Sequence, residues 1–243
     1  SLLKCMSRGF FARGFVEEVL TGGSINNAVE FGGKDQYGRQ TGGINIESAA
    51  SGSGARAVMD GIDSAWVPWN PEGDQGNAEM WELIYPHLYL GRRVITDSGG
   101  PGRNRGGCVF ESLWMIRNSD FVYTYQAPGL TRLATNFGVF GGYGGGSAYI
   151  HIAKDTDIAK RIAARRPIPH GEGDPKRPEL GRLLGGDIRC GLDAQYIGEP
   201  VAEGALYEKL YLPGGAGYGD PLDRTPAQVE QDVNRNQVSI AAA

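Results

Sequence analysis

Residues 97–107 read DSGGPGRNRGG, and this glycine-rich loop separates stretches whose composition predicts strands. Before it, residues 81–90 are aromatic and apolar but are interrupted by Pro86, which favours an edge strand or two short strands. After it, residues 108–116 and 121–125 are rich in β-branched and aromatic residues. The polar turn 118–120 lies between them, so we expect a β-hairpin. The loop therefore indicates a β-rich domain.

The remaining elements follow from local patterns on either side. Apolar residues spaced three to four apart predict a helix over residues 1–20, and a second helix is expected over 155–166. Short apolar runs predict strands at 44–46, 148–152, 187–192 and 206–212. Thr225, Pro226 and Gln228 form the pattern of a capping box and predict a final helix to about residue 237. We expect an α+β fold: a β-rich mixed domain with long glycine-rich loops and a C-terminal helix.

Composition excludes several classes of protein. The chain has 39 glycines in 243 residues, more than twice the average usage of about 7%. They follow no three-residue repeat of the collagen kind. A net charge of −4 gives no electrostatic footprint for nucleic acid, and no apolar run reaches the length of a membrane span. Three widely spaced cysteines indicate reduced thiols and a cytoplasmic protein, with no membrane partner.

The standard motifs of nucleotide binding and hydrolysis are absent from this sequence. No Walker A loop occurs, no Gly-x-Gly-x-x-Gly follows a predicted strand, and no Gly-x-Ser-x-Gly elbow is found. The strongest local candidate is the loop 97–107, where Asp97, Arg103 and Arg105 could contact a carboxylate or phosphate. The alternative is a structural turn whose arginines face solvent or a partner subunit. His170 is a candidate general acid or base, and the simpler interpretation of its context is a polar loop that follows a proline.

Two long blocks resemble the signatures of one protein family. Residues 212–224 (LPGGAGYGDPLDR), followed by Pro226, are similar to the C-terminal signature of the hydantoinase B/oxoprolinase family. Residues 97–107 resemble a second signature of the same family, in the expected order. Residues 137–143, 171–174 and 185–188 are similar to large subunits of the family's ketone carboxylases, which act on acetone or acetophenone. The resemblance covers residues 1–243, which we expect to be the C-terminal portion of such a subunit. A fragment of a longer chain is one interpretation of this portion.

The resemblance implies an ATP-dependent ligase that joins a ketone to bicarbonate, converting acetone to acetoacetate in a multi-subunit complex. Its implied partners are a hydantoinase A-like subunit, which would bind ATP, and a small subunit. The family's divalent metal is expected in a preceding part of the subunit, so no metal ligand is assigned here, and this stretch alone is expected to be inactive. Two alternatives stay open: an ATP-dependent hydantoinase or 5-oxoprolinase that opens a cyclic amide, and a non-catalytic subunit-docking module.

Overall fold

The computed structural model describes nine ranges of the chain: residues 2–16, 29–45, 51–65, 77–126, 136–146, 149–169, 180–190, 199–211 and 214–243. The helices are α1 (Leu2–Ala12), α2 (Ala78–Ile84), α3 (Ile158–Ala163), α4 (Leu180–Leu183), the short 3₁₀ helix η3 (Pro221–Asp223) and α5 (Pro226–Asn234). The strands are β1 (Val29–Lys34), β2 (Gln40–Asn45), β3 (His87–Val94), β4 (Phe110–Ile116), β5 (Val122–Gln126), β6 (Tyr149–Lys154), β7 (Asp187–Cys190), β8 (Glu199–Val201) and β9 (Leu206–Tyr211). This mixture confirms the α+β class.

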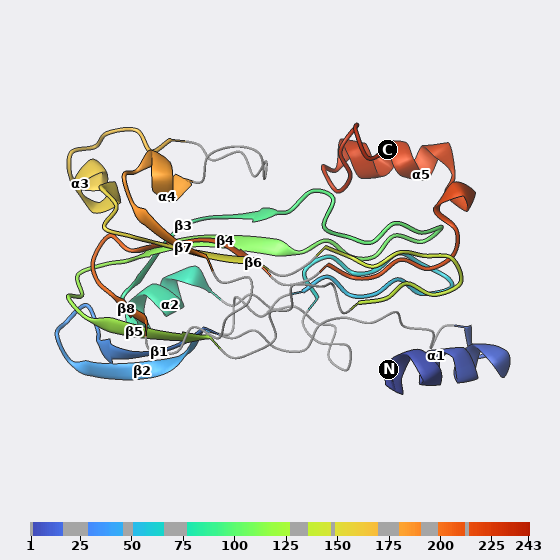
Figure 1. The fold of residues 1–243 in the computed structure, drawn as a ribbon, viewed down its shortest axis with the longest axis horizontal. Coiled ribbons are helices and arrows are strands. Elements are labelled where there is room, and N and C mark those ends of the chain that lie inside the picture. The colour runs from blue at the N-terminus through green and yellow to red at the C-terminus, as the bar shows by residue number, and fades with distance from the viewer. Residues whose placement is uncertain are drawn as a thin grey trace.

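The molecule is elongated, with two sheets at one end and a bundle of extended loop segments at the other (Figure 1). One sheet has the strand order β2-β1-β5-β8 and the second has the order β3-β4-β9-β6-β7. All strand pairs given for the two sheets are antiparallel. Antiparallel pairing suits a chain whose strands are joined by short turns as well as by long excursions.

The main core lies between the two sheets because their strands alternate in the direction of their side chains. Phe31 and Val122 from the four-stranded sheet pack with Trp114 and Tyr207 from the five-stranded sheet. Trp114 and Tyr207 are stacked, with ring centroids 3.8 Å apart. Met115, which follows Trp114, is buried in a second cluster on the opposite face of its sheet.

Helices α3 and α4 cover that opposite face and form a third layer. Ile158 at the start of α3, and Leu180 and Leu184 at α4, pack with Met115 and with residues of β6 and β9. The helix expected over 155–166 is therefore present, although its regular part is limited to α3. The exposed residues that follow α3 include Arg165 and Arg166.

The sequence-based hairpin over 108–125 is wrong in its pairing. Both strands exist, as β4 and β5, but β4 pairs with β3 and β9, whereas β5 pairs with β1 and β8. The turn after Ile116 therefore carries the chain from one sheet to the other. Asn118 within it adopts a left-handed φ of 52°, a conformation that asparagine tolerates better than most residues. The two faces of the core are joined by this crossing.

The expectation of strand over 81–90 is half wrong, because a helix occupies its first part. Asn77 caps α2: its side chain accepts a hydrogen bond from the Glu79 amide at 2.9 Å. The helix ends at Ile84, before Pro86, and β3 begins at His87. Trp81 stacks on Tyr85 at 5.8 Å, so the aromatic residues that suggested a strand instead lie one helical turn apart.

The termini follow the sequence patterns more closely. α1 lies within the predicted range 1–20 but ends at Ala12, and Gly14 beyond it has a positive φ of 86°. At the other end, Thr225 and Gln228 form both hydrogen bonds of the capping box, and Pro226 opens α5 as predicted. α5 ends at Asn234, one turn before the expected end. Strands β6, β7 and β9 coincide with predicted strands, whereas β2 overlaps the strand predicted at 44–46 only at residues 44 and 45.

The far end of the molecule is built by glycine-rich segments that carry no regular strand assignment. We call residues 51–65, 98–108, 136–146 and 214–219 the glycine bundle. They are joined by backbone hydrogen bonds, among them Gly100 to Gly215 at 2.7 Å and Tyr143 to Pro101 at 2.9 Å. Figure 1 shows them running side by side. Because the backbone N–H and C=O groups of one segment hydrogen-bond to those of its neighbours, the segments can be buried although they have few apolar side chains.

Glycine is required in the bundle because neighbouring backbones approach too closely for a β-carbon. A β-carbon at Gly102 would lie 2.6 Å from the amide nitrogen of Tyr218 and 2.7 Å from the carbonyl oxygen of Asn104. Glycines in the bundle also recur three residues apart, as in Gly142 and Gly145, or Gly214 and Gly217. That spacing is the period of an extended three-residue helix, in which glycine faces a crowded axis.

Candidate functional site

The two sequence signatures meet in the glycine bundle, although more than one hundred residues separate them. Asn104 and Tyr218 exchange backbone hydrogen bonds of 3.0 Å in both directions. The amide of Gly100 donates to the carbonyl of Gly215, and the amide of Arg103 donates to the carbonyl of Gly219 at 3.2 Å. The signatures are therefore two halves of one structural unit, and this unit presents the candidate residues Asp97, Arg103 and Arg105.

Arg105 is buried, with only 4% of its surface exposed. Its Nε lies 3.4 Å from Oδ1 of Asp232, and its Nη1 lies 3.3 Å from Oδ1 of Asp63. Nη1 also contacts the sulfur of Cys108 at 3.3 Å and donates to the carbonyl oxygen of Gly106. The guanidinium is thus used by groups of this chain, an arrangement that favours a structural role for Arg105.

Arg224, at the end of the second signature, completes the buried ionic network. It forms a two-pronged contact with Asp60, with both nitrogen–oxygen distances at 2.8 Å. Its Nε donates to Oδ2 of Asp232 at 2.9 Å. Asp60 also accepts from the Arg105 backbone amide at 2.7 Å. Planar, two-pronged pairs of this kind are among the strongest charge-assisted contacts in proteins. They join α5 and the segment 51–65 to the first signature.

The electrostatics of the network favour the ionised form of the Asp60 carboxylate. Burial raises the pKa of Asp60, but the hydrogen bonds and positive charge of Arg224, together with the Arg105 amide, outweigh burial and lower it. Burial raises the pKa of the Cys108 thiol, and the charge of Arg105 only partly opposes this. Cys108 is therefore a protonated, buried thiol and not a nucleophile. The network can hold the bundle in place. Arg105, Arg224 and Asp232 are the buried members of the network, whereas the side chains of Asp60 and Asp63 keep 33% and 26% of their surface exposed.

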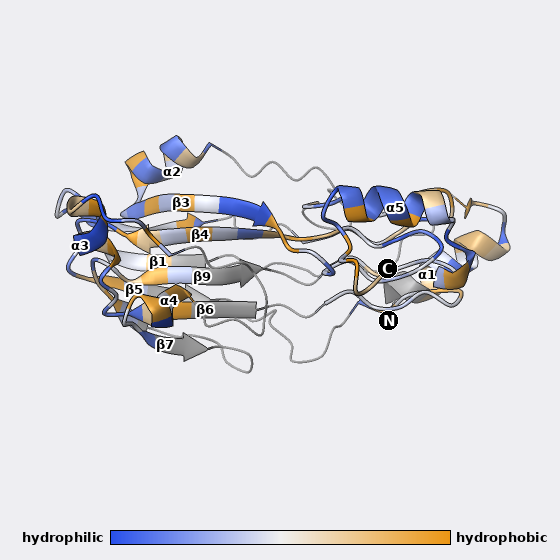
Figure 2. Cartoon of the chain, turned by 90° about the horizontal axis from the view of Figure 1, so that it is seen from above, coloured by the Kyte–Doolittle hydropathy of each residue, from blue (hydrophilic) through white to orange (hydrophobic). Residues whose placement is uncertain are grey.

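Asp97 and Arg103 lie on the outside of the same unit. Asp97 has a left-handed φ of 62°, and its carboxylate accepts from the backbone amide of Ser239 at 2.8 Å. Its own amide donates to the carbonyl of Gln237 at 3.0 Å, so Asp97 anchors the segment after α5. Figure 2 shows α5 lying against the bundle with a largely hydrophilic surface. Asp97 therefore holds the segment after α5 against the first signature.

Arg103 is exposed and is held in a defined direction. Its Nη2 donates to the carbonyl of Ala57 at 2.9 Å, and its guanidinium lies 5.4 Å from the ring centroid of Tyr218. An arginine steadied over an aromatic face keeps donors free to contact an anion. Asp97, Arg103 and Arg105 have different partners in this structure, and His170 lies outside the described residues. A role in anion binding therefore stays a prediction for Asp97, Arg103 and Arg105, and a role as general acid or base stays a prediction for His170.

The sequence analysis missed the residues that hold the signatures together, namely Asp60, Asp63 and Asp232. Each lies outside the two signatures, and acidic residues without a motif around them are ordinarily interpreted as surface groups. Of the residues in the ionic network, Arg105 and Arg224 lie within the two signatures. Asp232 lies two turns into α5, on the face directed at Arg105 and Arg224. A buried carboxylate on a helix of otherwise polar residues has no distinctive local pattern.

The described part of the chain lacks two kinds of feature. No group of three or more His, Cys, Asp and Glu side chains is placed to hold a metal ion in those ranges. No described helix is both long and apolar enough to cross a membrane.

Comparison with known proteins identifies the family. The profile of the family described as Hydantoinase B/oxoprolinase matches residues 7–221, nearly the whole chain. The chain belongs to the hydantoinase B/oxoprolinase family. The resemblance inferred from the two signatures is thereby confirmed, and both signatures lie largely within the matched region.

Three curated proteins are similar in sequence to this family member. It is 40% identical to the acetone carboxylase alpha subunit of Xanthobacter autotrophicus over 98% of this chain and 31% of the relative. It is 29% identical to the acetophenone carboxylase delta subunit of Aromatoleum aromaticum, over 87% of this chain and 31% of that subunit. It is also 29% identical to the caprolactamase subunit beta of Pseudomonas jessenii, over 82% and 29% respectively. The chain thus spans about a third of the length of these relatives.

A solved structure of acetone carboxylase is also similar to this chain. The chain superposes on a nucleotide-free structure of acetone carboxylase, described in terms of ATP-dependent acetone carboxylation, with a TM-score of 0.87 and 38% identity. The match covers 99% of this chain and 32% of that one. Fold and sequence therefore agree in relating this hydantoinase B/oxoprolinase family member to a ketone carboxylase subunit.

Proposed function

We propose that this chain is part of a subunit of an ATP-dependent ketone carboxylase that joins acetone to bicarbonate to form acetoacetate. The observation that carries the proposal is the similarity to the acetone carboxylase alpha subunit, 40% identical over 98% of the chain. The acetophenone carboxylase subunit is also similar, at 29% identity, so a ketone is the substrate class common to both. A similar chain with a similar fold is expected to support similar chemistry, although glycine signatures alone do not select a substrate.

The work of this portion is to build a rigid part of the subunit. The glycine bundle supplies a tightly packed backbone scaffold, and the buried ionic network fixes α5 to it. Arg103 is the member of the candidate set best placed to contact an anionic substrate or intermediate, because it is exposed and held in one direction. We retain Asp97 and Arg105 as candidates for such contacts, and His170 as a candidate general acid or base.

The cofactors and partners belong to the assembled enzyme. We propose that ATP binds on a hydantoinase A-like partner subunit and that a divalent metal is held in a part of the subunit outside residues 1–243. A small subunit would complete the hetero-oligomer. In this scheme the chain contributes structure and substrate contacts to a site completed by other parts of the enzyme, in the cytoplasm. The absence of a Walker A loop from this sequence agrees with such a division.

One alternative function is favoured by a specific observation. The similarity to the caprolactamase subunit beta, at 29% identity, supports an ATP-dependent hydrolase that opens a cyclic amide. The identity to the acetone carboxylase subunit is higher and its coverage more complete, so the ketone carboxylase is preferred. A second alternative is that this portion only docks subunits. Its bundle and ion pairs are consistent with that role as well.

The substrate assay separates these functions. The full-length subunit, purified with its partner subunits, is incubated with ATP and either acetone plus bicarbonate, 5-oxoproline, a hydantoin or caprolactam. We expect acetoacetate from the first mixture and no ring opening of the amides. Ring opening without acetoacetate formation would replace the proposal with the hydrolase.

Two arginine variants then separate chemistry from docking. Arg103→Glu reverses an exposed charge, and Arg166→Gln is its control because Arg166 is exposed on the loop after α3. If Arg103 contacts an anion, turnover of the assembled complex falls by about tenfold or more, the value of one charge-assisted hydrogen bond. If Arg103 only docks subunits, assembly weakens while each assembled complex turns over normally.

A further inference from the structure

Helix α1 exposes apolar side chains at the end of the molecule that holds the glycine bundle. Met6, Phe10 and Phe15 are 46%, 39% and 55% exposed. Met6 and Phe10 are four positions apart and therefore lie on the same side of the helix. Phe15, just after the helix, meets the ring of Phe10 edge to face, with ring centroids 6.4 Å apart. Figure 1 shows α1 on the side of the bundle away from α5.

The glycine bundle extends this apolar surface through Phe140. The ring centroid of Phe11 in α1 lies 4.5 Å from that of Phe140, which in turn lies 5.4 Å from that of Tyr218. Phe140 is exposed and has a left-handed φ of 52°, which is rare for a bulky side chain. The loop therefore holds an aromatic ring beside α1 in a strained conformation. We call the exposed apolar residues of the helix and the loop the α1 face: Met6, Phe10, Phe11, Phe15 and Phe140.

The described part of the chain holds α1 along one side only. The helix has 11 residues, and isolated helices shorter than about 12–15 residues are marginal in water. Such a helix is stabilised mainly by packing of its apolar side. Among residues 5–16, however, Ser7 is the single buried residue, and it lies one turn before Phe11 on the side that meets Phe140. The adjacent side, with Met6 and Phe10, is left open by the described residues.

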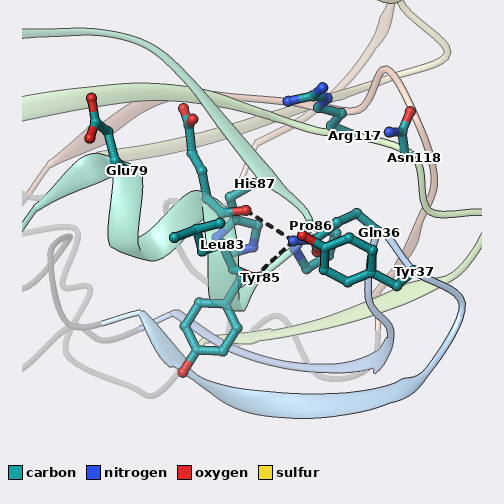
Figure 3. A pocket seen from close by; sticks show the side chains of 10 residues that line it. Gln36, Tyr37, Glu79, Leu83, Tyr85, Pro86, His87, Arg117 and Asn118 are labelled. Atoms are coloured by element: carbon teal, nitrogen blue, oxygen red, sulfur yellow. Dashed lines mark hydrogen bonds between the residues drawn. The ribbon is translucent and has the colours of Figure 1, made fainter.

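Helix α2 shows how this chain fixes a short helix with its own residues. It also exposes an apolar side chain, Leu83, but Gln36 donates from Nε2 to the carbonyl oxygens of Glu82 and Leu83, at 2.9 and 3.1 Å (Figure 3). The carboxylate of Glu82 also accepts from the amide of Tyr89 at 2.8 Å. These polar contacts tie α2 to two strands of the sheets, whereas α1 meets the bundle through the ring of Phe11. The open apolar side of α1 is therefore the stronger candidate for an interface.

We propose that the α1 face docks against an apolar surface of the same polypeptide, in a part that lies outside residues 1–243. The chain covers 31% of the acetone carboxylase alpha subunit, so more than two-thirds of that relative has no counterpart here. The inference rests on one element of the proposed function, that residues 1–243 belong to a longer subunit, and takes them as its C-terminal portion. The rest of the polypeptide then joins the chain next to α1, and a covalently joined surface is favoured over a separate chain by its high effective concentration.

Hydroxyl-radical footprinting of the full-length subunit, purified with its partner subunits, tests whether the α1 face is covered. Methionine is oxidised in proportion to its exposure, and Met59 is a matched control because it is also 46% exposed within residues 1–243. We expect Met6 to be oxidised at least about tenfold more slowly than Met59 in the full-length subunit, because docking excludes water from the face. A smaller difference overturns the proposal.

Photo-crosslinking from position 10 identifies what covers the face. The photoreactive analogue p-benzoylphenylalanine in place of Phe10 keeps an aromatic ring and captures C–H groups in contact with it. A cross-link to a peptide of the same polypeptide outside residues 1–243 supports the proposal. A cross-link to a partner subunit, to a second copy supplied as ¹⁵N-labelled protein, or to another site within residues 1–243 overturns it. No cross-link at all, or a natural polypeptide that consists of residues 1–243 alone, also overturns it.

A charge placed in the face gives an independent readout. Phe10→Asp should speed the oxidation of Met6 about tenfold in the full-length subunit, because a buried, unpaired carboxylate disfavours docking. The control Ile240→Asp, at a residue that is 85% exposed, should leave the Met6 rate unchanged. Equal Met6 rates in the two variants overturn the proposal. If Phe10→Asp unfolds the protein, the footprint and the cross-link decide. None of these measurements needs turnover, so this inference can fail while acetoacetate is formed, and it can hold when no acetoacetate is found.

Discussion

Replacing Gly102 by alanine tests whether the close approach of backbones holds the two signatures together. Gly102 does not have a positive φ, so alanine is compatible with its backbone, and any cost comes from the lack of space. The new β-carbon would lie 2.6 Å from the Tyr218 nitrogen and 2.8 Å from the Tyr218 oxygen. Ordinary contact begins at 3.4 Å, so the Tyr218 backbone must move by at least about 0.8 Å.

The magnitude follows from the hydrogen bonds that this movement disturbs. The two bonds between Asn104 and Tyr218, each 3.0 Å, and the 3.2 Å bond from Arg103 to Gly219 all lie at the contact. Each contributes about 0.5–1.5 kcal/mol net, and overpacking of a tight interior costs about 1–3 kcal/mol. We expect Gly102→Ala to reduce the local free energy of opening by about 3 kcal/mol.

Hydrogen exchange of the full-length protein, read by mass spectrometry on peptides that contain Asn104 and Tyr218, measures this effect. A loss of about 3 kcal/mol corresponds to exchange about 100-fold faster. The control is Gly91→Ala in β3, where a β-carbon would meet nothing within 4 Å. We expect that substitution to be neutral or slightly stabilising, by about 0.4–1 kcal/mol. Equal exchange at Asn104 and Tyr218 in both variants would refute the steric argument.

Three further predictions concern the buried charges and His87. Arg105→Met leaves Asp63 without its cation and leaves Asp232 paired with Arg224 alone, so it should destabilise the protein by about 3 kcal/mol in chemical denaturation, whereas the exposed Arg103→Met should cost less than about 1 kcal/mol; equal costs would contradict a structural role. Because the pKa of Asp60 is lowered on folding, its contribution to stability is present above the unfolded pKa, about 3.9, and is lost as the pH falls through the folded value. Asp60→Asn should therefore lower the melting temperature at pH 7 and have little effect at the lowest pH at which the protein stays folded; a constant difference would count against the ion pair. Burial lowers the pKa of His87 to about 3 in the folded protein, from about 6.5 when unfolded, so stability should fall as the pH decreases from about 6.5 toward 3; His87→Phe should flatten that part of the pH profile, and an unchanged slope would show that His87 is not its source.

Local chemistry was predictable wherever one short segment determines the structure. The capping box at Thr225 and Gln228 forms as expected because both partners lie within four residues. α1 also begins within its expected range, and several strands match their apolar runs. In contrast, α2 was missed because its aromatic residues suggest a strand, and the helix depends on the single cap Asn77. A cap residue is common in loops, so it is a weak signal by itself.

Long-range pairing was not predictable from composition. The sequences of β4 and β5, on either side of residues 117–121, are typical of a hairpin. In the structure, however, β4 pairs with β3 in one sheet and β5 pairs with β8 in the other. This outcome depends on which faces of β4 and β5 bury apolar side chains against the rest of the molecule. The strands β1 and β8 were not predicted, since β1 contains two glycines and β8 a proline.

The glycine bundle could be predicted from the sequence only in part. The two signatures identify the family, and their glycines predict close backbone approach. The sequence does not say that the signatures lie against each other, nor that Asp232 meets Arg105 and Arg224 between them. Those contacts join residues as far as 127 positions apart, and they determine that Arg105 is buried.

The proposed carboxylase function is tested most directly by following the carbon of bicarbonate. The full-length subunit with its partner subunits is incubated with ATP, acetone and ¹³C-labelled bicarbonate, and the products are analysed by mass spectrometry. Our account predicts acetoacetate that carries one ¹³C in its carboxylate and that forms only when ATP is present. Consumption of ATP with no labelled acetoacetate, accompanied by hydrolysis of caprolactam or 5-oxoproline in parallel reactions, would contradict it.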